Sequence, residues 1–177
     1  MNARKSVIGS MLVLSIAAIV MVGMGEAKGT VSLNEEGLAI GQPAPSFTLT
    51  DHHGEQVSLS DFEDKIVVLE WFNPQCPYVK LHHVKQTTMV DLANKYGEKE
   101  VVWLAINSSH FADDDFNKKW AEKWELPYAV LNDQSGDIGK AYGARTTPHM
   151  FIIDAEGKLV YQGAIDDDPR GRSDDPH

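Results

Sequence analysis

The order of strand and helix signals predicts an α/β domain with a mixed central sheet flanked by helices. Residues 66–69 and 101–106 are short apolar runs rich in β-branched side chains, which is typical of buried strands. Amphipathic stretches follow them at 77–96 and 113–124, and helical crossovers of this kind join parallel strands. Short alternating segments precede and follow this core, and they predict a hairpin at each end.

The first hairpin is an N-terminal extension of the sheet. Residues 42–45 contain two prolines and predict a stiff entry. Residues 46–50 alternate as a strand, 51–54 predict a turn, and 56–59 the returning strand. Residues 60–64 predict one short helical turn.

The other elements follow from periodicity and from helix-ending residues. Gly97 and Gly143 are placed as glycines that end helices, and Asp113 begins an acidic first turn that complements a helix dipole. The remaining expected elements are strands at 65–72, 100–107, 128–131, 149–154 and 159–163, and helices at 77–96, 113–124 and 138–142.

The N-terminus predicts a secretory signal peptide over residues 1–27. Arg4 and Lys5 precede an apolar run from 7 to 24, and cleavage after Ala27 fits the small residues there. An uncleaved membrane anchor is the alternative, because 18 apolar residues approach the roughly 20 that span a bilayer. The protein is therefore expected to be exported, to a periplasm or the extracellular space, with membrane attachment only if the leader is kept.

The remaining residues, 28–177, have the length of one ordinary domain. They carry 14 basic and 25 acidic side chains, a net charge of −11. An acidic domain of this kind argues against nucleic acid or an anionic membrane surface as its partner.

Cys76 is the only cysteine of the chain, and it lies where a strand turns into a helix. A helix N-terminus favours the thiolate, which is the reactive form of a cysteine. Pro77 at the first helical turn and Asn73 just upstream both fit a helix start. The alternative is a small buried apolar side chain, since free cysteines are often buried.

Three segments resemble redoxin domains, which include peroxiredoxins and exported thiol-disulfide oxidoreductases. They are residues 41–49, 66–77 and 146–154, and the resemblance runs from about Gly41 to Gly163. It implies a thioredoxin-like fold, with Cys76 as the nucleophile. It also implies a cis bond between Thr147 and Pro148 opposite that cysteine, where the Thr147 backbone could pair with an extended substrate. A strand-start proline with a trans bond is the alternative.

The chain departs from this family pattern in three ways. Val79 stands where thioredoxin-type motifs have a second cysteine, so no local disulfide can form. Asn73 stands where peroxiredoxins carry a threonine whose hydroxyl helps to hold a peroxide. The end of the chain looks loop-like, so the domain at 28–177 is expected to lack a last C-terminal helix and resolving cysteine, as a fragment would.

Three further residues are candidates for supporting the thiol. Lys80, four residues after Cys76, can share its helical face, or it can be an ordinary solvated lysine. Trp71 is expected to wall the site, to pack in the core, or both. Glu70 interrupts an apolar strand, where it could relay a proton near the thiol or point outward at the strand end.

Histidines offer a metal-binding alternative. His82 and His83 follow Cys76 by six and seven residues, and with it they could bind copper or zinc. Adjacent histidines point to different faces of a helix, however, which makes them a poor joint ligand pair. No cofactor is expected.

These observations predict a thiol-dependent oxidoreductase with Cys76 as its redox centre. The thiol would attack a peroxide or a partner disulfide, and an external thiol would have to complete the cycle. Two alternatives stay open. One is a binding module that kept the fold but lost turnover, and the other is a copper- or zinc-handling protein.

Overall fold

The computed structural model describes residues 38–168, so the predicted leader at 1–27 and the last nine residues lie outside the described part. Its seven strands form one sheet in the order β2-β1-β5-β4-β3-β6-β7. The strands are β1 (Thr48–Asp51), β2 (Gln56–Ser58), β3 (Ile66–Trp71), β4 (Val101–Asn107), β5 (Ala129–Asn132), β6 (His149–Ile153) and β7 (Leu159–Gly163). The helices are η1 (Leu59–Phe62), α1 (Pro77–Lys80), η2 (Leu81–Lys85), α2 (Thr88–Gly97), α3 (Asp114–Lys123) and α4 (Asp137–Tyr142).

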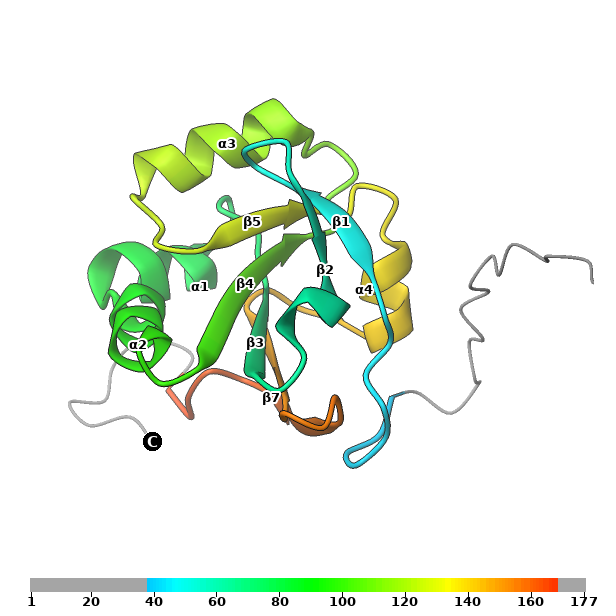
Figure 1. Cartoon of the computed structure of the whole chain (residues 1–177). Coiled ribbons are helices and arrows are strands. Elements are labelled where there is room, and N and C mark those ends of the chain that lie inside the picture. Colours follow the sequence, from blue (N-terminus) through cyan, green and yellow to red (C-terminus); the bar gives the residue numbers. More distant parts are fainter. Residues whose placement is uncertain (1–37, 169–177) are drawn as a thin grey trace, which may run out of the picture. The chain divides into compact units, whose positions relative to one another are not determined.

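The sheet is mixed, as the sequence predicts. Strands β3, β4 and β5 run parallel in the centre, joined by the helical crossovers. Strand β6 pairs antiparallel with β3, and β7 continues it as a hairpin at one edge. At the other edge β1 pairs antiparallel with β5 and with β2, which confirms the N-terminal hairpin (Figure 1).

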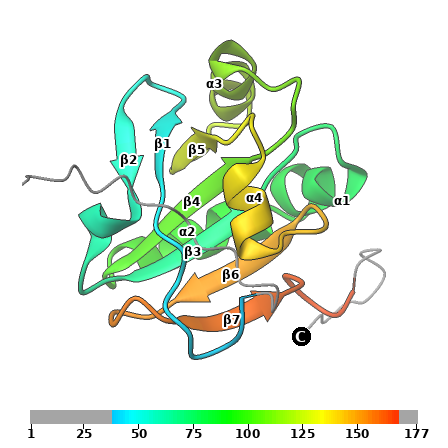
Figure 2. The same cartoon turned by 90° about the vertical axis from the view of Figure 1, so that its right-hand side faces the viewer.

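Side chains of β3 alternate between two hydrophobic cores, one on each face of the sheet. Val67, Leu69 and Trp71 belong to the core under α4. Val68 and Phe72 belong to the core that α1, α2 and α3 cover. The two views in Figures 1 and 2 show α4 on one face of the sheet and α2 on the other. Strand β3 ends at Trp71, and the chain then enters the loop that carries Cys76. The end of the strand is held by a packed core on each face of the sheet.

The single helix predicted at 77–96 is wrong. Helix α1 passes into the π-helical turn η2, and a break at Thr87, in the left-handed region at φ 54°, separates η2 from α2. The π turn faces both His82 and His83 inward, whereas Val84 is 55% exposed. Wider π turns of this kind are frequent at functional sites. Apolar spacing alone could not show the break, because the buried positions here are histidines.

Of the two glycines predicted to end helices, Gly143 does so in the expected conformation and Gly97 does not. Gly97 is the last residue of α2 and lies outside the left-handed region, so its expected capping role is wrong. Gly143 does cap α4, with φ 67°. Asp113 precedes α3 instead of forming its first turn, and its carboxylate accepts the backbone N–H of Phe116 at 2.8 Å. An N-cap carboxylate satisfies one of the free N–H groups at a helix start.

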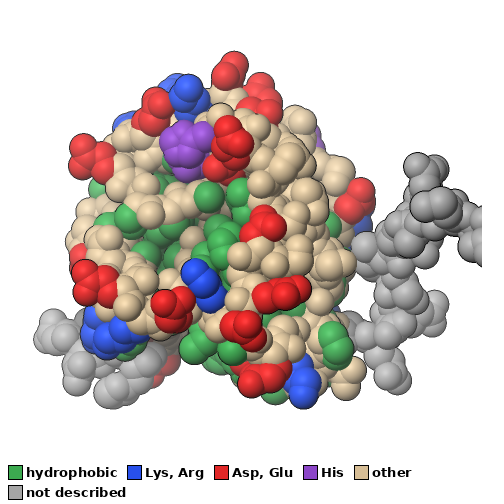
Figure 3. Space-filling view, viewed as in Figure 1, with side chains coloured by type: hydrophobic (Ala, Val, Ile, Leu, Met, Phe, Trp, Pro, Cys, Tyr) green, Lys and Arg blue, Asp and Glu red, His purple; other side chains and the backbone are tan. Residues whose placement is uncertain are grey.

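The surface is mostly polar. Figure 3 shows acidic side chains scattered over one face, around a hollow near β4 where hydrophobic side chains gather. Within residues 38–168, none of the helices is long and apolar enough to cross a bilayer.

Candidate active site around Cys76

Cys76 is the residue that precedes helix α1, in a loop that its neighbours shape. The carbonyl of Asn73 accepts the Cys76 N–H at 2.9 Å, and the Asn73 side chain accepts the Gln75 N–H at 2.8 Å. Pro77 is the first helical residue, as predicted, and the Lys80 N–H closes the first turn on the Cys76 carbonyl at 3.0 Å. The asparagine found in place of a threonine therefore serves the loop itself.

The thiol meets the loop between α4 and β6. The bond between Thr147 and Pro148 is cis, as predicted. Cys76 Sγ lies 3.0 Å from the Thr147 carbonyl oxygen, in a geometry in which the thiol donates a hydrogen bond. The cysteine is half-buried, so its sulfur is neither sealed in the core nor fully in solvent. Two predicted site residues that are 71 positions apart in the chain, Cys76 and Thr147, thus come together.

Trp71 both fills the core and borders the site. It is 3% exposed, and its Nε1 donates to Ser108 Oγ at 3.0 Å. Ser108 in turn donates to Asp133 Oδ2 at 2.5 Å, and the same oxygen accepts the backbone N–H of Gly139 at 2.9 Å. This chain of hydrogen bonds ties the end of β3 to helix α4, which leads into the Thr147 loop.

Thr146 and Thr147 line two small pockets. One, of about 260 Å³, includes Trp71, Ser108 and Arg145 in its lining. The other, called here the Thr147 pocket, has a volume of about 200 Å³. Its lining residues come from α1 and η2, the cis-proline loop and the segment after β7: Tyr78, His82, Thr146, Thr147, Pro148, Ala164, Ile165 and Asp166.

Glu70 does not point outward at the strand end, so that alternative is wrong. Its carboxylate is fully buried, and Oε1 lies 2.7 Å from Nε2 of the equally buried His83. Its other oxygen accepts the Tyr128 hydroxyl at 3.5 Å. Burial and this carboxylate both raise the pKa of Tyr128. Glu70 thus joins η2 to Tyr128, the residue before β5, and anchors the helical segment that carries the thiol.

His82 and His83 point to different partners. His82 Nδ1 lies 3.9 Å from Asp166 and 3.5 Å from the Thr88 hydroxyl, whereas His83 faces Glu70. Burial lowers the pKa of His82, and the nearby carboxylates oppose this effect. Within residues 38–168 no group of three or more His, Cys, Asp or Glu side chains is arranged to hold a metal ion.

Lys80 is exposed, consistent with the solvated alternative. Val79, at the position of the second cysteine in thioredoxin-type motifs, is completely buried.

Sequence reasoning missed two partnerships in this region: Glu70 with His83, and Ser108 with Asp133. A carboxylate inside an apolar strand signals a buried polar partner, because an unpaired buried charge is costly. Nothing in the local pattern identifies that partner. Ser108 and Asp133 follow neighbouring strands at the same edge of the sheet, which is the only signal that could have linked them.

Comparison with known proteins decides the family. The AhpC/TSA family model matches residues 40–162. The chain belongs to the AhpC/TSA family. It is 33% identical over 128 residues to the thiol-disulfide oxidoreductase ResA of Bacillus thuringiensis subsp. konkukian, covering 72% of this chain and 71% of the relative.

Similar solved structures support the fold. An uncharacterized conserved protein from Geobacillus kaustophilus has a TM-score of 0.70 and 35% identity, covering 80% of this chain and 77% of that one. The thioredoxin domain of a thiol-disulfide oxidoreductase from Bacteroides vulgatus has a TM-score of 0.64 and 25% identity, covering 75% and 93%. The fold is thioredoxin-like, as predicted.

Proposed function

We propose that this protein is a thiol-disulfide oxidoreductase in which Cys76 is the reacting sulfur. The observation that carries the proposal is the placement of a half-buried thiol 3.0 Å from the carbonyl of Thr147, a residue that lines two small pockets. The relatives named thiol-disulfide oxidoreductases support it. A cysteine needs partial access and a place for its partner to react, and this position supplies both.

The proposed reaction is thiol-disulfide exchange. Cys76 loses its proton to solvent, and the thiolate attacks one sulfur of a partner disulfide. A new S–S bond forms to Cys76, the partner's own S–S bond breaks, and the second partner sulfur leaves with the electron pair and takes up a proton. The Thr147 carbonyl accepts a hydrogen bond from the resting thiol, so ionisation frees it to accept one from the partner's backbone.

An external thiol must complete the cycle. Residue 79 is a buried valine and not a cysteine, so the mixed disulfide at Cys76 cannot be resolved by a thiol three residues further along the helix. A small thiol or a reduced protein would attack the mixed disulfide, release Cys76 as thiolate and become oxidised itself. We expect this exchange outside the cytoplasm, as the leader at residues 1–27 predicts.

Peroxide reduction is the second candidate, because the AhpC/TSA family match favours it. In that reaction the Cys76 thiolate would take one oxygen from the peroxide, become a sulfenic acid and release water or an alcohol. Asn73 offers no hydroxyl, and its side-chain oxygen already accepts the Gln75 N–H. We therefore place disulfide exchange first.

The test compares the native protein with its own unfolded chain. Reduced protein is mixed at pH 7 with a peptide disulfide, and the mixed disulfide at Cys76 is followed by mass spectrometry. We expect the native rate to exceed the rate in urea at least tenfold, with no adduct in Cys76→Ser. A native rate equal to or below the unfolded rate would overturn the proposal.

Parallel reactions assign the remaining alternatives. Labelling by a sulfenic-acid probe after dilute hydrogen peroxide, without accelerated disulfide exchange, would favour the peroxide reaction. Tight stoichiometric copper or zinc that is lost on His82→Gln would favour a metal-handling protein. If the protein neither accelerates disulfide exchange, nor forms a sulfenic acid, nor binds metal tightly, the result would favour a binding module.

A further inference from the structure

One of the two pockets that Thr146 and Thr147 line is also lined by Arg145, and we call it the Arg145 pocket. It has a volume of about 260 Å³. Pockets that enclose drug-sized molecules have roughly 300–1,000 Å³, so the Arg145 pocket suits a smaller ligand. Trp71 and Phe72 supply an apolar wall, and the loops after β4 and α4 supply polar side chains.

The polar side chains of the Arg145 pocket can donate hydrogen bonds to a ligand. Arg145 is exposed, and its guanidinium forms no ion pair with any residue in the described range 38–168. The hydroxyls of Ser109, Thr146 and Thr147 also line the pocket, and none of them is hydrogen-bonded to another residue in that range. A guanidinium presents five N–H donors in a planar fork that matches the two oxygens of a carboxylate.

The positive charge of Arg145 is not balanced at the pocket surface. Among residues 38–168 no Asp or Glu lines this pocket, although the chain has 26 acidic and 16 basic residues. Asp133 lies behind Ser108, is 2% exposed, and accepts hydrogen bonds from Ser108 and from the Gly139 N–H. Burial and the Arg145 cation both lower the pKa of His149, which leaves that ring neutral at pH 7. The pocket therefore attracts an anion.

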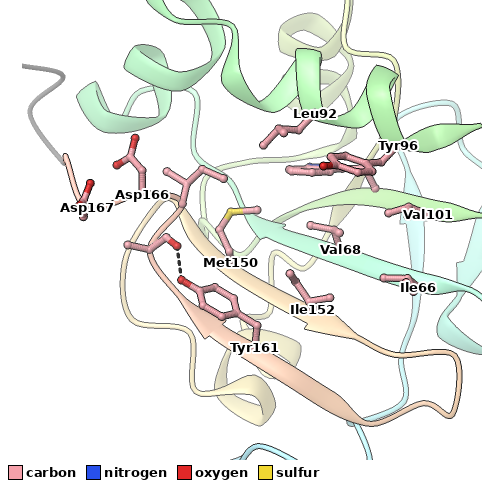
Figure 4. A pocket seen from close by; sticks show the side chains of 13 residues that line it. Ile66, Val68, Leu92, Tyr96, Val101, Met150, Ile152, Tyr161, Asp166 and Asp167 are labelled. Atoms are coloured by element: carbon pink, nitrogen blue, oxygen red, sulfur yellow. Dashed lines mark hydrogen bonds between the residues drawn. The ribbon is translucent and has the colours of Figure 1, made fainter. Parts of the chain in front are cut away.

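Two other pockets of the protein carry the opposite charge. Asp166 lines the Thr147 pocket, and Asp166 and Asp167 line a larger apolar pocket at the end of β7 (Figure 4). No Lys or Arg of the described part of the chain lines either of them. The last helix expected for this fold would follow β7 there, so we assign the apolar pocket no ligand. An anionic group is drawn to the Arg145 pocket and repelled by the other two.

Thr147 connects the Arg145 pocket to the reacting sulfur. It lines the pocket, and its carbonyl oxygen lies 3.0 Å from Cys76 Sγ. Arg145 precedes Thr147 by two residues, and at roughly 3.3 Å per residue their backbones are at most about 7 Å apart. A small molecule whose carboxylate binds Arg145 therefore has its other end within reach of a disulfide at Cys76.

We propose that the Arg145 pocket binds the carboxylate of a low-molecular-weight thiol, and that this thiol frees Cys76 from its mixed disulfide. The inference rests on the proposed function and names the chemical class of the external thiol. The bound thiolate attacks the partner's sulfur, and a new S–S bond forms between the two. The bond to Cys76 breaks, and the Cys76 sulfur leaves with the electron pair and takes up a proton from solvent. The small thiol is oxidised, and Cys76 is reduced.

The experiment measures how fast matched thiols release a peptide from Cys76. The full-length protein is first joined through Cys76 to the cysteine of a fluorescent peptide without charged residues. It is then mixed at pH 7 with 3-mercaptopropionate, with the uncharged methyl ester of that thiol, or with the cation cysteamine, and release is followed by fluorescence anisotropy. Each rate is divided by the rate for the same mixed disulfide unfolded in urea, so the intrinsic reactivities of the three thiols cancel.

The matched variants are Arg145→Gln in the pocket and Lys158→Gln in the turn between β6 and β7. Both side chains are exposed and both changes remove one positive charge, so both variants should fold and carry the same net charge. We expect 3-mercaptopropionate to be at least fivefold faster than its ester and cysteamine to be slowest. The net charge of −10 would by itself favour the cation. Arg145→Gln should abolish the advantage, Arg145→Lys should keep part of it, and Lys158→Gln all of it.

Equal normalised rates for the three thiols would overturn the inference, as would an advantage of 3-mercaptopropionate that Arg145→Gln keeps. The proposed function would stand in both cases, because the mixed disulfide forms before these thiols are added. If the native protein forms that disulfide no faster than its unfolded chain, the proposed function fails. The pocket is then tested in Cys76→Ser by NMR titration with 3-(methylthio)propionate, which has no thiol. No binding, or binding that a second change of Arg145→Gln leaves unaltered, would overturn the inference as well.

Discussion

The hydrogen bond between Glu70 and His83 is the buried interaction under the thiol-bearing helix whose removal should cost the most stability. Both side chains have zero exposure, and the joined oxygen and nitrogen are 2.7 Å apart. In His83→Leu the carboxylate keeps, of its two side-chain hydrogen bonds within residues 38–168, only the one from the Tyr128 hydroxyl at 3.5 Å. Breaking a buried pair by removing one partner typically costs about 3–5 kcal/mol. A typical domain has only about 5–15 kcal/mol of stability in total.

Urea unfolding at pH 7, followed by circular dichroism, measures this loss. Glu70→Gln is the matched control, because the amide keeps the size of the side chain and can still bond to His83, so we expect a loss of about 1 kcal/mol. The double variant Glu70→Leu/His83→Leu should lose less than the sum of Glu70→Leu and His83→Leu, since neither member of the pair is left without the other and only the Tyr128 hydroxyl loses its acceptor. A loss below about 1 kcal/mol for His83→Leu would refute the reasoning.

Three further predictions concern local geometry and pH. In Gly139→Ala the new methyl group would lie 2.9 Å from Ser108 Oγ, so we expect about 1–3 kcal/mol of destabilisation, whereas Gly97→Ala, with no atom within 4 Å, should melt at or above the wild-type temperature. Asp113→Ala removes the 2.8 Å cap of α3 and should cost about 1 kcal/mol by urea unfolding. Burial lowers the pKa of His82 in the folded state. The unfolded chain therefore binds more protons below about pH 6.5, and stability should fall on acidification from pH 7 to 5. His82→Gln should make that fall shallower, and an unchanged slope would contradict the assignment.

Much of the fold could be predicted from local patterns. The β3 strand, the turn at Cys76 and the two hairpins were recognisable because strand periodicity and turn residues act over a few positions. Helix α3 shows how far this goes. Its aromatic stripe of Phe116, Trp120 and Trp124 forms consecutive ring contacts, with centroids 6.3 and 5.3 Å apart, as its spacing predicts.

Helix 77–96 shows where local patterns fail. The buried positions of η2 are His82 and His83, which no hydrophobic pattern marks as interior. They are buried because Glu70 and Asp166, distant in the sequence, lie beside them in the fold. The π turn and the break at Thr87 follow from that packing.

By itself the sequence determined which residue types stand at each position of the reacting segment: one sulfur before a helix, a valine where a second sulfur would be, and a threonine-proline pair that begins 71 residues on. Only the tertiary structure decided what these residues touch. It placed Cys76 against Thr147 and turned Glu70 inward to His83. The reason is physical: strand and turn signals depend on near neighbours, whereas pairing and pockets depend on which distant segments the sheet brings together.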